Sequence, residues 1–302
     1  MPARQASPDQ IAADAATSTR QEWNHRPQVP IQTSQLPEWC PRQIATAKWY
    51  LDSWFFITIN GSIVALALIA YTWFSPTLEQ ARTFGFGWIS IVLARNCILL
   101  GLVAGTLHLW LHKYAHQGSE LKYDQRPVHR YGRLLTLNSQ LPDNIFWSLA
   151  SGVTIWSAFE VLIWWAMANG HAPSITWNSY PIWFVAIFFL IPVWESFYLY
   201  WIHRLPHIRP LYRFHALHHR NTDVGPWSGL SVHPVQHLIY FGTAMIHFVV
   251  ATHPMHMIFH LMFHALLAVT SHTGFEGQLF RNKNAGASGQ FPPPNPPPLF
   301  RM

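Results

Sequence analysis

Histidines carry the strongest chemical signal in this sequence. Of the 19 histidines in the 302 residues, 13 fall between His203 and His272, whereas the first 107 residues contain only His25. Neutral imidazole binds Fe, Zn, Cu and Ni, so such a dense group of histidines indicates a transition-metal centre. The chemistry that we expect of these residues is therefore metal ligation.

Two of these histidines stand four residues apart in the sequence HRLPH. The spacing of His203 and His207 would place both imidazoles on one face of a helix, within reach of one ion. Pro206 lies between them and could end or bend that helix.

Three more follow in the sequence RFHALHHR, where a helix would place His215 beside both His218 and His219. Histidines that only solvate a helix end at the membrane surface are the alternative interpretation. Five histidines at ligand spacing within 17 residues favour metal binding instead.

Other histidines recur at helical spacing with a less specific meaning. His108, His112 and His116 form a stripe that we interpret as an interfacial face near lipid headgroups. Further histidines could be ligands, although hydrogen-bonded core groups or partners that orient ligands are favoured: His233, His237, His256, His260 and His264. Glu195 could orient a ligand imidazole, or it could pair with Arg95.

The cysteine content restricts the kind of metal site. Only Cys40 and Cys97 are present, and neither forms a CxxC motif, which argues against a disulfide framework, a cysteine zinc site and an iron–sulfur cluster. The histidines outnumber the ligands of one tetrahedral ion. This excess favours iron.

The elements that position these residues are hydrophobic helices. Charged residues make up 11% of the chain, against about 25% in a typical soluble domain. Four apolar runs reach the roughly 20 residues that a hydrocarbon core requires; they cover residues 54–74, 88–111, 145–167 and 182–202. Between residues 233 and 271 we expect two short helices, broken near Pro254. The predicted fold is thus an all-α integral membrane protein with about four transmembrane helices and histidine-rich membrane-embedded or interfacial helices.

Composition divides the chain into three parts. Residues 1–46 are polar and predict a flexible leader without a cleavable signal peptide. Residues 47–279 form the predicted membrane domain. Residues 280–302 contain a proline-rich run and predict a disordered or aberrant tail.

Basic residues flank alternate apolar runs, which predicts the orientation of a multi-pass protein. Lys and Arg gather before the first run, between the second and third, and after the fourth. The positive-inside rule therefore predicts the N-terminus and the histidine motifs on the cytoplasmic side. Because the net charge of +6 is scattered at membrane edges, we expect membrane lipids and no nucleic acid as partners.

Taken together, HRLPH and HALHH after four hydrophobic runs resemble the HxxxH and HxxHH boxes of the fatty acid hydroxylase and sterol desaturase superfamily. WSGLSVHPVQH and SHTGFEG extend the resemblance from about residue 48 to residue 277. The resemblance implies a non-haem centre of two iron ions, O₂ as co-substrate, a fatty acyl or sterol-like lipid substrate and an external electron-transfer partner. The positions that it marks as metal ligands are His203, His207, His215, His218, His219 and His272.

The chain departs from the pattern of the superfamily in one respect. No histidine follows His272, so the last HxxHH box is missing. An inactive, truncated member of the family is therefore one alternative, and a non-enzymatic metal-binding or haem-binding membrane protein is another. The implied chemistry requires no side-chain nucleophile, and the sequence indicates no catalytic residue.

Overall fold

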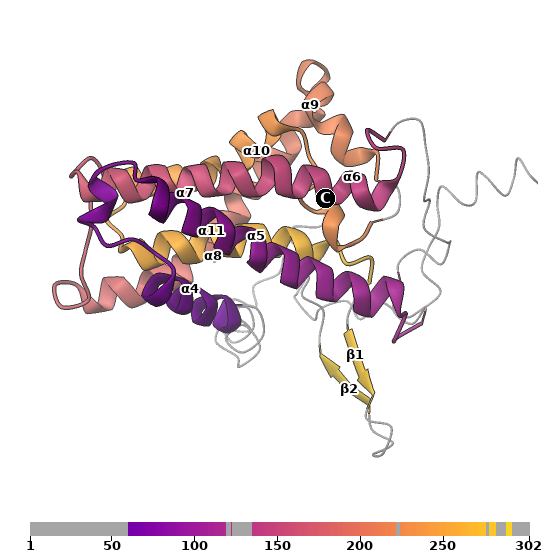
Figure 1. The fold of residues 1–302 in the computed structure, drawn as a ribbon, viewed down its shortest axis with the longest axis horizontal. Coiled ribbons are helices and arrows are strands. Elements are labelled where there is room, and N and C mark those ends of the chain that lie inside the picture. Colours follow the sequence, from indigo (N-terminus) through magenta and orange to yellow (C-terminus); the bar gives the residue numbers. More distant parts are fainter. Residues whose placement is uncertain are drawn as a thin grey trace, which may run out of the picture.

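The computed structural model describes residues 60–118, 122, 135–221, 224–275, 278–281 and 288–291, the last two segments by their backbone alone. The long helices are α4 (Gly61–Trp73), α5 (Phe86–His108), α6 (Gln140–Trp147), α7 (Thr154–Ala168), α8 (Pro181–Arg204), α9 (Arg209–His219), α10 (Pro234–Phe241) and α11 (Pro254–Ser271). Shorter helical segments are η2 (Gln80–Arg82), η3 (Leu109–Lys113), η4 (Ser148–Val153), η5 (Leu205–His207), η6 (Pro226–Ser228) and η7 (Gly242–Phe248). Figure 1 shows the long helices packed side by side, with α9 at the edge of the bundle.

Four helical stretches are long and apolar enough to cross a membrane: Phe86–Lys113, Gln140–Ala168, Pro181–His207 and Pro254–Ser271. They confirm the prediction of a helical protein with four candidate spans, and the first three coincide with predicted runs. Of the predicted run 54–74, the structure describes only the 13-residue helix α4 and its immediate flanks; residues 54–59 lie outside the described part.

The fourth candidate span is α11, which is longer than the short helix expected there. The break at Pro254 was predicted correctly, but α11 continues for 18 residues. Its histidines do not interrupt it because 15 of its 18 residues are buried among protein side chains. Polar side chains at membrane depth are tolerated when they face the interior of a bundle.

Prolines and histidines define where the helices begin. Proline occupies one of the first two positions of α8, α9, α10 and α11, where its missing N–H leaves no hydrogen bond unmade. The Nδ1 atom of His233 accepts a hydrogen bond of 3.1 Å from the backbone N–H of Val235, and His253 caps α11 in the same way. Two histidines therefore serve as helix caps.

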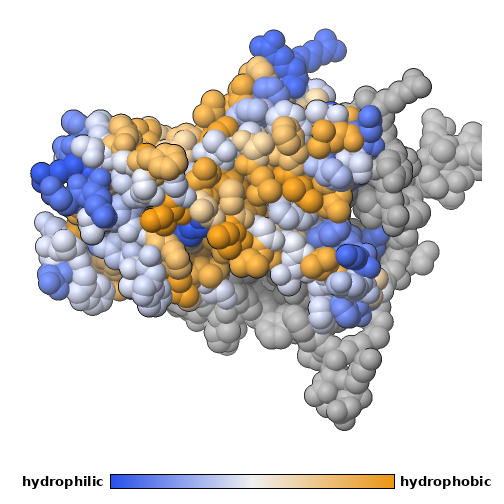
Figure 2. Space-filling view, viewed as in Figure 1, coloured by the Kyte–Doolittle hydropathy of each residue, from blue (hydrophilic) through white to orange (hydrophobic). Residues whose placement is uncertain are grey.

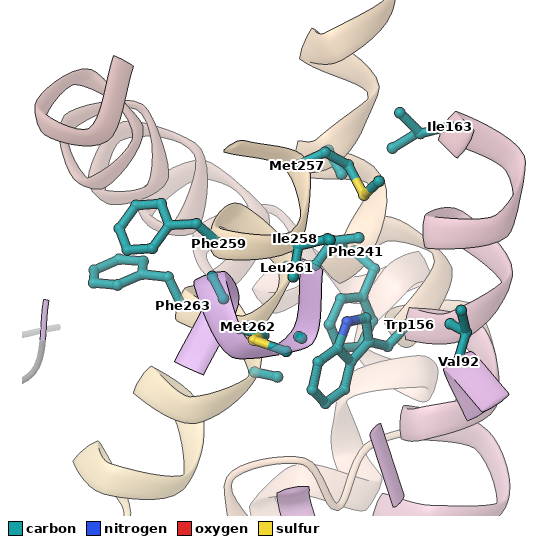
Figure 3. Packing of buried hydrophobic residues seen from close by; sticks show 14 of the residues in the cluster. Val92, Trp156, Ile163, Phe241, Met257, Ile258, Phe259, Leu261, Met262 and Phe263 are labelled. Carbon is teal, nitrogen blue, oxygen red and sulfur yellow. The ribbon is translucent and has the colours of Figure 1, made fainter. Parts of the chain in front are cut away.

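The core is built around α11, whose side chains interdigitate with those of neighbouring helices (Figure 3). Met257, Ile258, Phe259 and Leu261 have no exposed surface. Small buried residues, including Ala67 on α4 and others on α11, permit the close helix approach that stabilises bundles in lipid. The surface is apolar in turn: Figure 2 shows hydrophobic residues over the middle of the visible face and hydrophilic residues over α9.

A buried ion pair joins α5 to α7. The guanidinium Nη2 of Arg95 lies 2.5 Å from a carboxylate oxygen of Glu160, and Asn96 donates a hydrogen bond of 3.1 Å to Ser157. The carboxylate partner of Arg95 is therefore Glu160. The pairing of Arg95 with Glu195, which was one interpretation of the sequence, is wrong.

A short antiparallel hairpin follows the last helix. Strands β1 (Gln278–Arg281) and β2 (Ser288–Phe291) pair with Gln278 opposite Phe291, and Figure 1 shows them projecting from the bundle. These strands, which were not predicted, cross the proposed boundary between residues 279 and 280. That boundary and the leader 1–46 remain predictions, since the leader and residues 292–302 lie outside the described residues.

Candidate metal centre

Four histidines converge where α8 ends and the chain folds back into α9. One ring nitrogen from each of His203, His207, His215 and His219 lies within 4.8 Å of the other three. The ring centroid of His215 lies 4.5 Å from that of His219, 4.8 Å from that of His203 and 4.9 Å from that of His207. His215 is therefore the centre of the group.

The backbone explains how HRLPH and RFHALHHR meet. The α-conformation of α8 ends at Arg204, and the chain tightens into the 3₁₀ turn η5 around Pro206. Ile208 is extended, with φ −67° and ψ 131°, so α9 turns away from the direction of α8. The predicted helical face of the second motif is confirmed, because the ring of His215 lies 5.4 Å from that of His218 and 4.5 Å from that of His219.

His218 and His272 form a pair beside the four-histidine group. Their ring centroids are 5.2 Å apart, and that of His218 is 6.3 Å from the ring of His203. The Nδ1–H of His272 donates to the carbonyl oxygen of Ala268 at 2.8 Å, which leaves its Nε2 as an acceptor. The six predicted ligands thus lie together as four histidines and an adjacent two.

Burial keeps the imidazoles of α9 neutral. It lowers the pKa of His215 to about 4, despite a hydrogen bond with Gln236 that acts in the opposite direction. Burial, reinforced by His272 and other histidines, holds the pKa of His218 well below its ordinary value. Since neutral imidazole is the form that binds a metal, both residues are ready to act as ligands at neutral pH.

Unsatisfied nitrogens show that the residues fit a metal. Within the part of the chain that the structure describes, the buried Nε2 of His215 and Nδ1 of His218 have no hydrogen-bond partner. Such an atom costs about 1–3 kcal/mol, which a metal–nitrogen bond would offset. Two nitrogens bound to one ion are at most about 4.2 Å apart, close to the 4.8 Å spread observed. The donor set therefore suits an ion held by His203, His207, His215 and His219.

Two other histidines of the region lie outside this group and form hydrogen bonds of their own. His237 contacts the hydroxyl of Ser151 at 2.8 Å and the carbonyl oxygen of Leu230 at 3.1 Å. His256 donates to the carbonyl oxygen of Phe184 at 2.9 Å. These contacts agree with the interpretation of such residues as hydrogen-bonded core groups.

A second polar cluster, which the sequence did not predict as a unit, lies deeper in the bundle. Glu195 contacts Nε2 of His260 with one carboxylate oxygen and Nδ1 of His264 with the other. Thr243 donates to Glu195 at 2.6 Å, and His247 lies 2.9 Å from His260. All five residues are at most 1% exposed. This Glu195 cluster joins α8 to α11 two helical turns before His203, so Glu195 orients imidazoles of α11 rather than the predicted ligands.

His112 has a role that the interfacial interpretation missed. Its Nε2 lies 2.8 Å from the carbonyl oxygen of Thr273, next to His272. Gly274 follows with φ +82°, and a Cβ there would lie 2.7 Å from the carbonyl oxygen of Val224. The only signal in the sequence was the helical spacing of the stripe, which shows a face but not its partner.

Comparison with protein families agrees with this site. The family model described as fatty acid hydroxylase matches residues 188–289, about a third of the chain. Comparisons with curated proteins and with solved structures gave no match. The matched range begins within α8 and contains all six predicted ligands. Residues 188–289 are thus similar to the fatty acid hydroxylase family.

Proposed function

We propose that this protein is an O₂-dependent, iron-containing membrane oxidoreductase that hydroxylates or desaturates a fatty acyl or sterol-like lipid. The observation that carries the proposal is the convergence of four imidazoles at the end of a candidate membrane span, inside the segment that matches the fatty acid hydroxylase family. Lipid substrates and the site would then share one environment, the edge of the bilayer.

The histidines divide the work of holding metal. His203, His207, His215 and His219 would hold one ion, and His218 with His272 would face a second. Bound iron would supply the redox chemistry by which O₂ attacks an unactivated C–H bond. The side chains themselves ligate the metal and position it; none of them is required to act as a nucleophile.

The exposure of the site suits exchange with partners. His207 and His219 are exposed, whereas His215 is fully buried. The exposed edge would receive electrons from a separate electron-transfer protein, and membrane lipids would supply the substrate. By the distribution of Lys and Arg, this edge would face the cytoplasm.

The proposal is tested by following lipids in cells that produce the protein. Under ¹⁸O₂, extracted lipids should gain one labelled hydroxyl group, or lose two hydrogens, relative to cells that produce His215→Ala. A mass spectrum of total fatty acids and sterols measures both changes. If iron-loaded protein with an active reductase system changes no lipid, the proposal is wrong and an inactive member of the family is the better interpretation.

A further inference from the structure

Gln236 contacts the central histidine of the metal centre from a different helix. Its side-chain nitrogen lies 2.8 Å from Nδ1 of His215. Gln236 is 8% exposed and His215 is fully buried, so water does not compete freely for this contact. The residue stands in the first turn of α10, which Pro234 and the capping His233 fix in place.

α10 is also held against α9, the helix that carries His215. The ring of His233 lies 5.2 Å from that of Phe214, directly before His215 in the sequence. Gln236 is therefore presented to His215 by a rigid helix start.

Two atoms without hydrogen-bond partners indicate which residue donates in this contact. The Oε1 of Gln236 and the Nε2 of His215 are both buried without a hydrogen-bond partner. The oxygen and nitrogen of a glutamine amide have nearly the same shape, so its orientation must be decided from hydrogen bonding. If the amide nitrogen faces Nδ1, the ring proton must lie on Nε2, which then cannot bind a metal.

Rotation of the amide by half a turn resolves this conflict. Oε1 of Gln236 then accepts a hydrogen bond from Nδ1–H of His215, and Nε2 carries the free electron pair. Histidines that bind metals usually donate their other N–H to an oxygen in this way.

We propose that Gln236 is a positioning residue of the metal centre: it accepts a hydrogen bond from Nδ1–H of His215, and thereby directs Nε2 of that ring to the metal. This inference rests on the proposed function, since it assumes that the four-histidine group holds an ion. It adds a residue from α10 to a site whose ligands come from α8, η5 and α9.

The test compares metal affinity in three variants of the full-length protein in detergent. Gln236→Met keeps the size of the side chain but removes the acceptor, whereas Gln236→Glu keeps an acceptor. Gln140→Leu alters another buried glutamine, 7% exposed, and is the matched control. Affinity for Co²⁺ is measured by competition with a chromophoric chelator, and the visible spectrum of bound Co²⁺ reports the ligand geometry.

We expect Gln236→Met to bind Co²⁺ about 10–100 times more weakly than the wild type, with an altered spectrum. Gln236→Glu and Gln140→Leu should both stay within about threefold of the wild type or, for Gln236→Glu, bind more tightly. A purely structural role would be kept by Met, which fills the same space, whereas an acceptor role would not. The Met variant therefore separates positioning from packing, and the Glu variant shows whether an acceptor at this position is sufficient.

Two results would overturn the inference. If the wild type binds Co²⁺ and folded Gln236→Met binds it equally well, Gln236 does not position His215, and the proposed function is unaffected. If the wild type binds no metal, both proposals fail together. Should Gln236→Met not fold, Gln236→Glu decides: a tenfold or greater loss of affinity in that variant contradicts the acceptor role.

Discussion

The Nε2 atom of His112 lies 2.8 Å from the carbonyl oxygen of Thr273. This contact ties the end of the span that contains α5 to the segment directly after α11, 161 residues away in the sequence. His272 precedes Thr273, and its ring faces His218. The position of the pair His218 and His272 therefore depends on a residue outside the predicted ligands.

Replacing His112 with Phe should destabilise the protein. The substitution removes the donor and leaves the carbonyl group of Thr273, a residue only 3% exposed, without its partner, at a cost of about 1–3 kcal/mol. Thermal unfolding in detergent measures the change. His116→Phe is the control, since His116 is exposed and its ring stacks on Trp110. Equal melting temperatures of the two variants would contradict the role of His112.

The ion pair of Arg95 and Glu160 predicts a strongly non-additive mutant cycle. Arg95→Met or Glu160→Met alone leaves one charge buried without its counter-ion, and each should lower the free energy of unfolding by about 3–5 kcal/mol. The double variant should lose much less than the sum, because it buries no charge. Unfolding in mixed micelles with increasing SDS measures all three. Additive losses would show that the two residues act independently.

Gly229 occupies a position that tolerates no side chain. A Cβ at this position would overlap the carbonyl oxygen of Ala268 on α11. Gly229→Ala should therefore destabilise the protein by at least about 1–3 kcal/mol. Gly105→Ala is the control, because a Cβ there meets nothing within 4 Å and alanine is the better helix former. If Gly229→Ala has the same melting temperature as the wild type, the close approach of Gly229 to α11 is wrong.

Because His237 is buried in its neutral form, the protein should lose stability on acidification. Burial lowers its pKa to about 4, whereas the unfolded chain has a value near 6.5. The unfolded state therefore binds more protons between these values, so stability is present above pH 6.5 and falls as the pH drops towards 4. From pH 7 to pH 5 this residue alone should cost about 2 kcal/mol.

The comparison is with His237→Gln, which cannot titrate in this range. Its free energy of unfolding should be lower than that of the wild type at pH 7, because the contacts with Ser151 and Leu230 are altered. The difference between the two proteins should narrow at pH 5. A difference independent of pH would mean that His237 is not held in its neutral form.

Short-range patterns predicted the local parts of this structure well. The apolar runs gave three of the candidate spans, and the spacing of RFHALHHR gave the face of α9, because both depend only on the periodicity of a helix. The length of α11 was underestimated for a physical reason: its histidines look like interruptions until their buried partners are known. Glu195 and His260 are 65 residues apart, and no local pattern joins them.

The same limit applies to the residues around the four-histidine group. The sequence indicated the six candidate ligands, but their grouping into four and two depends on the turn at Pro206 and on the path of the chain after α11. Gln236 contacts His215 and His112 contacts Thr273 from other helices, and neither residue type marks such a contact. Those contacts became visible only in three dimensions.

Metal content of the detergent-purified protein tests the central claim most directly. We predict at least about one iron ion per chain in the wild type, measured by inductively coupled plasma mass spectrometry. His215→Ala/His219→Ala should lose it, while His116→Ala, outside the group, should keep it. Less than about one ion per two chains in the wild type, with iron and zinc counted together, would contradict a histidine-held metal centre, as would full metal content in the double variant.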